Sequence, residues 1–144
     1  MRYELAGELA VALPPAEAWV LFTPRGEEAW VDGWRPRFPS PAEDDTAPGT
    51  VFLTDSHGAR TTWVVVDSEP GRRVRYSRHA HDTSAGTVTV ELAADAAGTG
   101  STVAVTYTLT ALTAEAGPDL ARFAAHYPEF LRGWQDAIAG SLTG

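Results

Sequence analysis

The sequence predicts an α+β fold, in which a curved antiparallel sheet of about seven strands wraps around a long C-terminal helix. Three observations support it. A half-buried strand is followed by two short helical segments, a run of closely spaced strands comes next, and one long amphipathic segment ends the chain. The 144 residues have the length of one domain, which we expect to span residues 1–144.

The N-terminal third combines a strand with short helices. Residues 2–13 alternate apolar and charged side chains, as a strand with one buried face does. A Pro-Pro pair ends this strand, and PAEAWVLF (15–22) predicts a short helix that begins at a proline. RGEEAWVDGW (25–34) predicts a second brief helix. The stretch 36–49 is rich in proline and acids, so it predicts a short edge strand and a long loop.

The middle of the chain predicts an antiparallel meander. Segments rich in β-branched and apolar residues are separated by turn signals too short for the crossovers that parallel strands require. The segments are 50–55, 59–67, 72–81, 86–95 and 101–112. The turn between the first two, at Ser56 to Gly58, contains His57.

The segment from Pro118 to Leu142 predicts one long amphipathic helix, because apolar residues recur in it at helical spacing. Pro128 lies inside this segment, so we expect a kink or a shift in hydrogen bonding there. Since no other segment is long enough to cover a sheet, the sheet should wrap around this helix, with the short helices closing one end.

Composition and charge exclude several classes of function. The chain has no cysteine, which excludes disulfides, thiolate nucleophiles and cysteine-ligated metals. All 11 basic residues are arginine, so lysine chemistry is excluded, and the net charge of −8 opposes nucleic acids and anionic membranes. No apolar run could span a bilayer and the N-terminus lacks a secretory signal pattern. We therefore expect a cytoplasmic protein without membrane insertion.

The order of elements resembles the START-like (SRPBCC) superfamily, whose members have the helix-grip fold. The stretches that carry the resemblance are ALPPAEAWVLFT, EEAWVDGW, VVVDSEPGRRVRYS and FLRGWQDAIAGSL. They look most like the polyketide cyclase/dehydratase and lipid-transport group, or the branch related to activators of heat-shock protein ATPase. The resemblance covers nearly the whole chain and brings no single catalytic signature. It implies a hydrophobic cavity between helix and sheet, and no particular reaction.

Aromatic side chains and a few polar groups are predicted to line this cavity. On the strand 72–81, the inward register set by Val74 and Tyr76 also turns Arg78 inward, where a guanidinium needs an anion or a carbonyl. The polar candidates are Tyr76, Arg78 and Tyr107. The aromatic candidates are Trp30, Trp34, Phe38, Trp63, Phe123, Tyr127, Phe130 and Trp134. The alternative is that the rings only fill the core and that Arg78 reaches solvent.

The stretch YSRHAHDT (76–83) raises the alternative of a metal site. His79 and His81 are two residues apart on a strand, so they project to the same side. If Tyr76 and Arg78 face inward, both imidazoles face solvent, and an ordinary solvated strand end is the better interpretation. We therefore expect no metal. The glycines punctuate turns and form no phosphate loop, so we expect no cofactor.

Three functions are open at this point. The sequence favours binding of a small hydrophobic molecule, such as a lipid, a polyketide or another aromatic or apolar metabolite. The second is a polyketide cyclase or aromatase-like enzyme in which Tyr76, Arg78 and Tyr107 surround the substrate. The third is a co-chaperone-like interaction protein with an exposed apolar patch around Trp30 and Trp34. The sequence leaves undecided whether the chain forms a homodimer.

Overall fold

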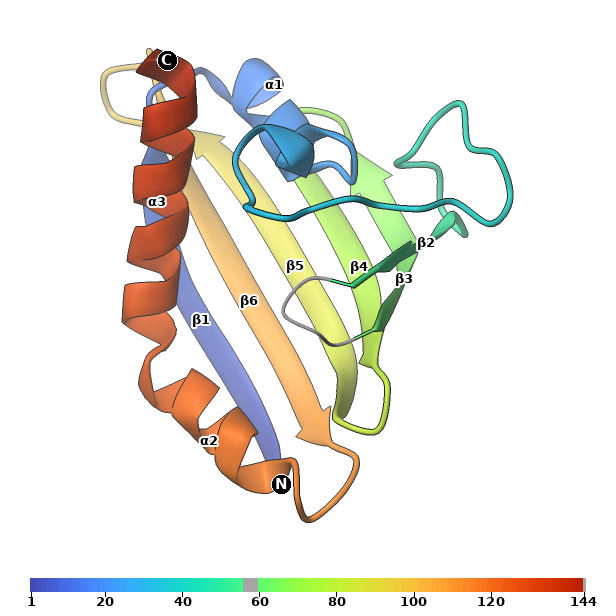
Figure 1. Cartoon of the computed structure of the whole chain (residues 1–144). Coiled ribbons are helices and arrows are strands. Elements are labelled where there is room, and N and C mark those ends of the chain that lie inside the picture. Colours follow the sequence, from blue (N-terminus) through green and yellow to red (C-terminus); the bar gives the residue numbers. More distant parts are fainter. Residues whose placement is uncertain (56–59, 144) are drawn as a thin grey trace.

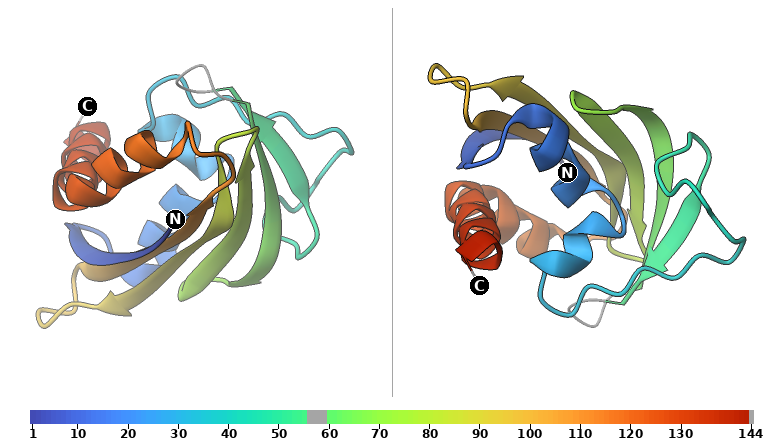
Figure 2. Two further views of the ribbon diagram at one scale, coloured as in Figure 1. Left: turned by 90° about the horizontal axis from the view of Figure 1, so that it is seen from below. Right: turned by 90° about the horizontal axis from the view of Figure 1, so that it is seen from above.

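The computed structural model describes residues 1–55 and 60–143, so the turn predicted at Ser56 to Gly58, with His57, lies outside the described residues. An antiparallel sheet curves around the C-terminal helices, and short helical turns close one end of it (Figures 1 and 2). The strand order is β1-β6-β5-β4-β3-β2, so the first strand of the chain lies beside the last. This arrangement is the predicted helix-grip architecture.

The strands fall where the alternating pattern predicts them. They are β1 (Arg2–Val11), β2 (Val51–Thr54), β3 (Thr61–Glu69), β4 (Arg73–Ala80), β5 (Ser84–Ala94) and β6 (Ser101–Ala111). All neighbouring pairs are antiparallel, which confirms the meander. The described part of the chain has six strands where about seven were predicted. The proline-rich stretch 36–49 contributes only an isolated bridge, from Arg37 to Leu53.

The short helices follow β1 as predicted, although only the first is α-helical. They are α1 (Pro15–Ala18) and the 3₁₀ turns η1 (Trp19–Phe22) and η2 (Gly26–Ala29). The predicted C-terminal helix is two helices, α2 (Gly117–Ala125) and α3 (Tyr127–Thr143), which meet at His126. Pro128 lies in the first turn of α3. Backbone N–H groups in a first turn have no acceptor within the helix, so the missing N–H of proline removes no helical hydrogen bond. Among the described residues, no helix combines the length and the apolar character that crossing a bilayer requires.

The concave face of the sheet carries the core. Of the residues that the sequence predicts to face inward on β4, Val74 and Tyr76 are buried and Arg78 is half-buried, in agreement with the predicted register. Alternate residues of β4, β5 and β6 are buried on this face. They are Val74, Tyr76, Val88, Val90, Leu92, Val103, Val105, Tyr107 and Leu109.

Helix α3 packs against β1, which is an edge strand. A Cβ atom at Gly7 would lie 2.6 Å from Cδ1 of Leu131, so the glycine permits the close approach of the helix. Gln135 Oε1 accepts a hydrogen bond of 2.8 Å from the backbone N–H of Ala10. This bond satisfies a donor on β1, where an open edge would otherwise invite pairing with another chain. The helix is therefore held along one side of the sheet, as Figure 2 shows.

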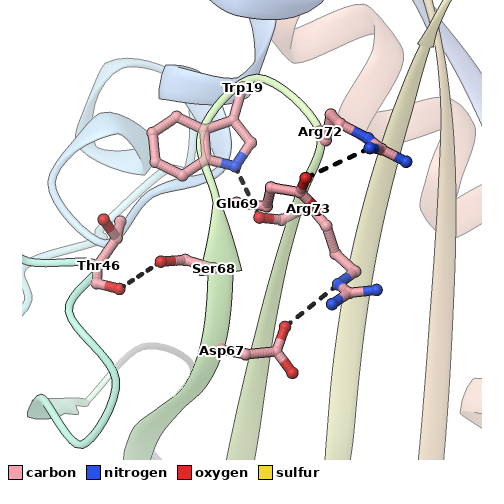
Figure 3. A network of polar contacts seen from close by, with 7 residues as sticks. All are labelled: Trp19, Thr46, Asp67, Ser68, Glu69, Arg72 and Arg73. Atoms are coloured by element: carbon pink, nitrogen blue, oxygen red, sulfur yellow. Dashed lines mark hydrogen bonds and ion pairs between the residues drawn. The ribbon is translucent and has the colours of Figure 1, made fainter.

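The hairpin of β3 and β4 holds the N-terminal helical segment and the long loop (Figure 3). The indole N–H of Trp19 donates to the carbonyl of Arg73 at 3.0 Å. The Ser68 hydroxyl donates to the carbonyl of Thr46 at 2.7 Å. The Arg73 side chain also pairs with Asp67 at 3.2 Å. These bonds tie segments far apart in sequence to the end of the sheet that the short helices close.

The contact between α3 and β1 generates a prediction for stability. Gly7→Ala should lower the free energy of unfolding by about 1–3 kcal/mol, because the added methyl group would overlap Leu131. Gly140→Ala is the matched control, since its Cβ atom would meet no atom within 4 Å. The control should be neutral or stabilising by up to about 1 kcal/mol, as expected for alanine in a helix. Urea unfolding measures both, and equal stabilisation by the two substitutions would contradict a tight contact.

Candidate functional site

A cavity of about 720 Å³ lies between the concave face of the sheet, η2 with the loop after it, and the helices α2 and α3. Its lining is rich in aromatic side chains from all of these elements. They are Trp30, Trp34, Trp63, Tyr107, Phe123, Phe130 and Trp134. A long, curved sheet that contacts its helix at one edge leaves this space elsewhere on its concave face.

The rings pack against one another, mostly edge to face, in two groups. In the group next to the helices, the centroids of Phe123 and Phe130 are 4.9 Å apart, and Trp30 and Trp134 are 5.2 Å apart. In the group next to β2 and β3, Trp63 lies 5.7 Å from Trp34. Such pairs stabilise the folded state beyond the area that they bury. The rings therefore form walls of defined shape.

Hydrogen bonds hold three of these indoles in place. Trp30 donates to the carbonyl of Leu21 and Trp34 to that of Pro24, each at 2.7 Å. Trp63 donates to the hydroxyl of Thr54 at 3.0 Å. Since each N–H group is satisfied within the protein, these side chains offer ring surface to the cavity. The walls are preformed, as in most small-molecule sites.

Arg78 reaches the cavity from β4, and its side chain is half-buried. Its Nη1 donates to the hydroxyl of Ser84 at 3.1 Å, and its Cζ lies 5.7 Å from the centroid of Trp63. Within residues 1–55 and 60–143, no carboxylate forms an ion pair with it. Burial lowers the pKa of Arg78, but an arginine stays charged at physiological pH. The cavity wall thus contains a cation that has no counter-ion among the described residues.

The three inward-facing tyrosine hydroxyls differ in their partners. Tyr76 donates to the carbonyl of Phe22 and Tyr127 to that of Val105, each at 2.7 Å. Tyr107 is 7% exposed and lines the cavity, and its hydroxyl has no hydrogen-bond partner among the described residues. Among the described residues, every fully buried side-chain nitrogen or oxygen atom has a hydrogen-bond partner. The unpaired hydroxyl oxygen of Tyr107 is therefore not fully buried, and it faces the cavity space. Burial raises the pKa of Tyr107 well above its usual value, so its hydroxyl is a neutral donor.

Glu27 brings a carboxyl group to the cavity from η2. The side chain is partly exposed because it faces the cavity space, while the protein around it removes bulk water. This desolvation raises the pKa of Glu27 well above its usual value, so the neutral acid is favoured. An ionised Glu27 would in turn raise the pKa of Tyr76 and of Tyr107.

Further carboxylates lie at the rim of the cavity. Asp32, Asp119 and Glu129 are exposed lining residues. Asp119 pairs with Arg122, and Glu129 pairs with Arg132 at 3.5 Å, so two of these charges are partly balanced on the helices. Solvent and salt screen such exposed groups. Their field is therefore weaker inside the cavity than their number suggests.

The structure brings most of the predicted site residues to one cavity. Trp30, Trp34, Trp63, Arg78, Tyr107, Phe123, Phe130 and Trp134 line it. Phe38, Tyr76 and Tyr127 are not among its lining residues. Phe38 packs against Phe52, with ring centroids 5.8 Å apart, and the two tyrosine hydroxyls bind backbone carbonyls. The role of all these residues in ligand binding stays a prediction.

Sequence reasoning missed several lining residues, although helical spacing could have indicated them. Glu27 precedes Trp30 by three residues, which puts the two side chains on one side of a helical turn. Gly133 and Ala137 follow Phe130 at the same kind of spacing on α3. Small residues and acids carry no signal of their own for a cavity wall, whereas aromatic side chains do.

His79 and His81 both face solvent, as the strand register predicts. Their ring centroids are 6.4 Å apart, and His81 Nε2 lies 3.2 Å from a carboxylate oxygen of Asp82. Within the described part of the chain, no group of three or more potential metal ligands occurs.

The tyrosine hydroxyls generate a prediction for stability. Tyr127→Phe should lower the free energy of unfolding by about 1 kcal/mol or more, because the buried carbonyl of Val105 loses a bond. Tyr107→Phe should leave it unchanged or raise it, since that hydroxyl has no protein partner to lose. Denaturant unfolding measures both. A loss for Tyr107→Phe as large as that for Tyr127→Phe would contradict a free hydroxyl.

Glu27 generates a prediction for the pH dependence of stability. Because its folded-state pKa is raised, the folded state keeps its proton longer than the unfolded state. Its contribution to the free energy of unfolding therefore falls as pH rises above the usual carboxyl pKa. Glu27→Gln should reduce the fall measured from about pH 5 to about pH 8, and Glu28→Gln, at the exposed neighbouring position, should not. Identical pH profiles for the two variants would contradict the desolvation of Glu27.

No family model matches the chain, and no curated protein matches it. Solved structures do. DynU16, a protein of the dynemicin biosynthetic locus, is 18% identical with a TM-score of 0.66. The match covers 94% of this chain and 47% of DynU16, so the chain spans about half the length of that protein.

Two further structures match over nearly their whole length. Ara h 8.0201 is 16% identical with a TM-score of 0.68, and the match covers 100% of both chains. The Aha1 dimer from Colwellia psychrerythraea is 14% identical with a TM-score of 0.65, covering 94% of this chain and 96% of that one. At these identities the likeness concerns the fold alone. The chain shares the helix-grip fold with these structures.

Proposed function

We propose that the protein binds a small, largely aromatic or apolar molecule in the cavity between the sheet and α3. The observation that supports this most is a cavity of about 720 Å³ with preformed aromatic walls. This volume lies within the range of roughly 300–1,000 Å³ that is typical of small-molecule sites. The fold neighbour from a biosynthetic locus agrees with a small-molecule ligand.

The energetics of the walls favour such a ligand. Covering aromatic surface contributes about 25 cal/mol for each Å² removed from water. The indoles of Trp30, Trp34 and Trp63 are already oriented by hydrogen bonds, so binding would lose little side-chain entropy. A flat ring system would suit walls in which rings present both faces and edges.

The cyclase-like alternative needs Tyr76, Arg78 and Tyr107 around one substrate. Arg78 and Tyr107 line the cavity, whereas the Tyr76 hydroxyl is buried and donates to the carbonyl of Phe22. A proton donor engaged in this way is poorly placed for general acid–base catalysis. The geometry supports binding more directly than it supports this reaction.

The co-chaperone-like alternative needs an exposed apolar patch around Trp30 and Trp34. The two side chains are 8% and 9% exposed, and both indole N–H groups bind backbone carbonyls. These rings belong to the core and to the cavity wall, which argues against a docking surface at this place.

The proposal is tested by filling the cavity. The wild-type protein should bind the neutral fluorescent probe N-phenyl-1-naphthylamine, seen as a rise in emission. Gly133→Leu should weaken this binding by about tenfold or more, because Gly133 lines the cavity and its Cβ position is open. The substitution should not lower stability, since leucine is the better helix former.

Gly140→Leu is the matched control. It lies on the same helix, its Cβ position is also open, and it does not line the cavity, so probe affinity should be unchanged. Absence of binding to the wild-type protein, or equal effects of the two substitutions, would overturn the proposal.

A further inference from the structure

We propose that the end of the cavity formed by Arg78 and Tyr107 is a carboxylate-binding subsite, so that the ligand is an aromatic carboxylic acid. This inference rests on the proposed function and adds the chemical class of the ligand. It follows from the unused donors of the two side chains, their common position, and the rings that surround them.

The guanidinium of Arg78 has more donors than the protein uses. An arginine side chain carries five N–H groups. In the described part of the chain the side chain donates one hydrogen bond, to Ser84, and no carboxylate lies within ion-pair distance. A partly buried cation without an anion costs free energy, which a bound anion would recover.

The hydroxyl of Tyr107 is a second free donor in the same cavity. It comes from β6, whereas Arg78 comes from β4. On β5, which lies between these strands, Val88 pairs with Tyr107 and Gly86 pairs with Arg78, so the two side chains start two residues apart in register on the same face of the sheet. The charge of Arg78 lowers the pKa of Tyr107, and Tyr107 raises that of Arg78, so the two groups are electrostatically coupled. A carboxylate has two oxygens, which a guanidinium and a neighbouring hydroxyl can share.

The rings next to the two donors indicate what the carboxylate is attached to. Trp63 lies beside the guanidinium, and the centroids of Phe123 and Phe130 lie 5.4 Å and 5.8 Å from that of Tyr107. A molecule that placed its carboxylate at Arg78 would therefore place its body among aromatic rings. An aromatic body fits these surroundings better than a flexible chain, because ring contacts have preferred geometry and little rotational freedom to lose.

The acidic groups of the cavity do not cancel this preference. Asp32, Asp119 and Glu129 are exposed at the rim, where solvent screens them. Glu27 is the acid farther from solvent, and desolvation raises its pKa, which favours the uncharged form. A neutral carboxyl group donates a hydrogen bond and does not repel an anion. The opposite assignment, a cationic ligand held by these acids, is one outcome of the test.

The test compares matched ligands by isothermal titration calorimetry at neutral pH. The wild-type protein should bind 2-naphthoate more tightly than 2-naphthamide, its neutral analogue, by about tenfold or more, as expected for hydrogen bonds to a charged group. Arg78→Gln should remove this preference while N-phenyl-1-naphthylamine still binds. Arg75→Gln, exposed on the same strand, removes the same net charge and should keep the preference.

Tyr107→Phe is a second variant, which tests the subsite even if Arg78→Gln does not fold. It should reduce the preference by about threefold to tenfold. Equal affinity of the wild-type protein for both ligands, tighter binding of 2-naphthylmethylamine, or equal losses in Arg78→Gln and Arg75→Gln would each overturn the subsite. Binding of the neutral probe in these cases would leave the proposed function standing, whereas a protein that binds none of the probes would overturn both.

Discussion

The seating of α3 on the edge strand β1 is the constraint on which the rest of the structure depends. Gly7 allows Leu131 to approach the strand, and Gln135 binds the backbone of Ala10, so the helix is held at one side of the sheet. The sheet curves away from this contact (Figure 2). The rest of the concave face is covered by η2, the loop after it, α2 and the side chains of the sheet. These fill the space only in part, and the cavity is what remains.

The distribution of polar groups separates structural residues from candidate binding residues. Tyr76, Tyr127 and the indoles of Trp30, Trp34 and Trp63 each donate to an acceptor within the protein, which is what a buried donor requires. The Tyr107 hydroxyl, the Glu27 carboxyl and most N–H groups of Arg78 have no hydrogen-bond partner among the described residues, and all three side chains line one cavity. Unsatisfied groups gathered in one place are more simply explained by a ligand than by independent defects in packing.

The sequence predicted the fold well because alternation and helical spacing directly report burial. It placed Arg78 in the wall for the same reason, since residues two apart on a strand share a face. The sequence could not distinguish Tyr76 from Tyr107, because both face inward. Tyr76 on β4 and Tyr107 on β6 pair with the same residue of β5, Val88. Their roles differ only because the carbonyl of Phe22 reaches Tyr76 from a distant part of the chain. Alternation contains no information on such contacts, nor on the desolvation of Glu27.

The fold and the chemistry of the cavity are set by different residues, and this has a consequence for how ligand preference can change. The neighbours share the fold at 14–18% identity, so the fold tolerates wide sequence change. The candidate polar groups come from β4, β6 and η2, and among the described residues their only side-chain hydrogen bond joins Arg78 to Ser84. Replacing them would break little of the packing. Keeping them unpaired opposes stability, so their presence is better explained by what the cavity holds than by what folds it.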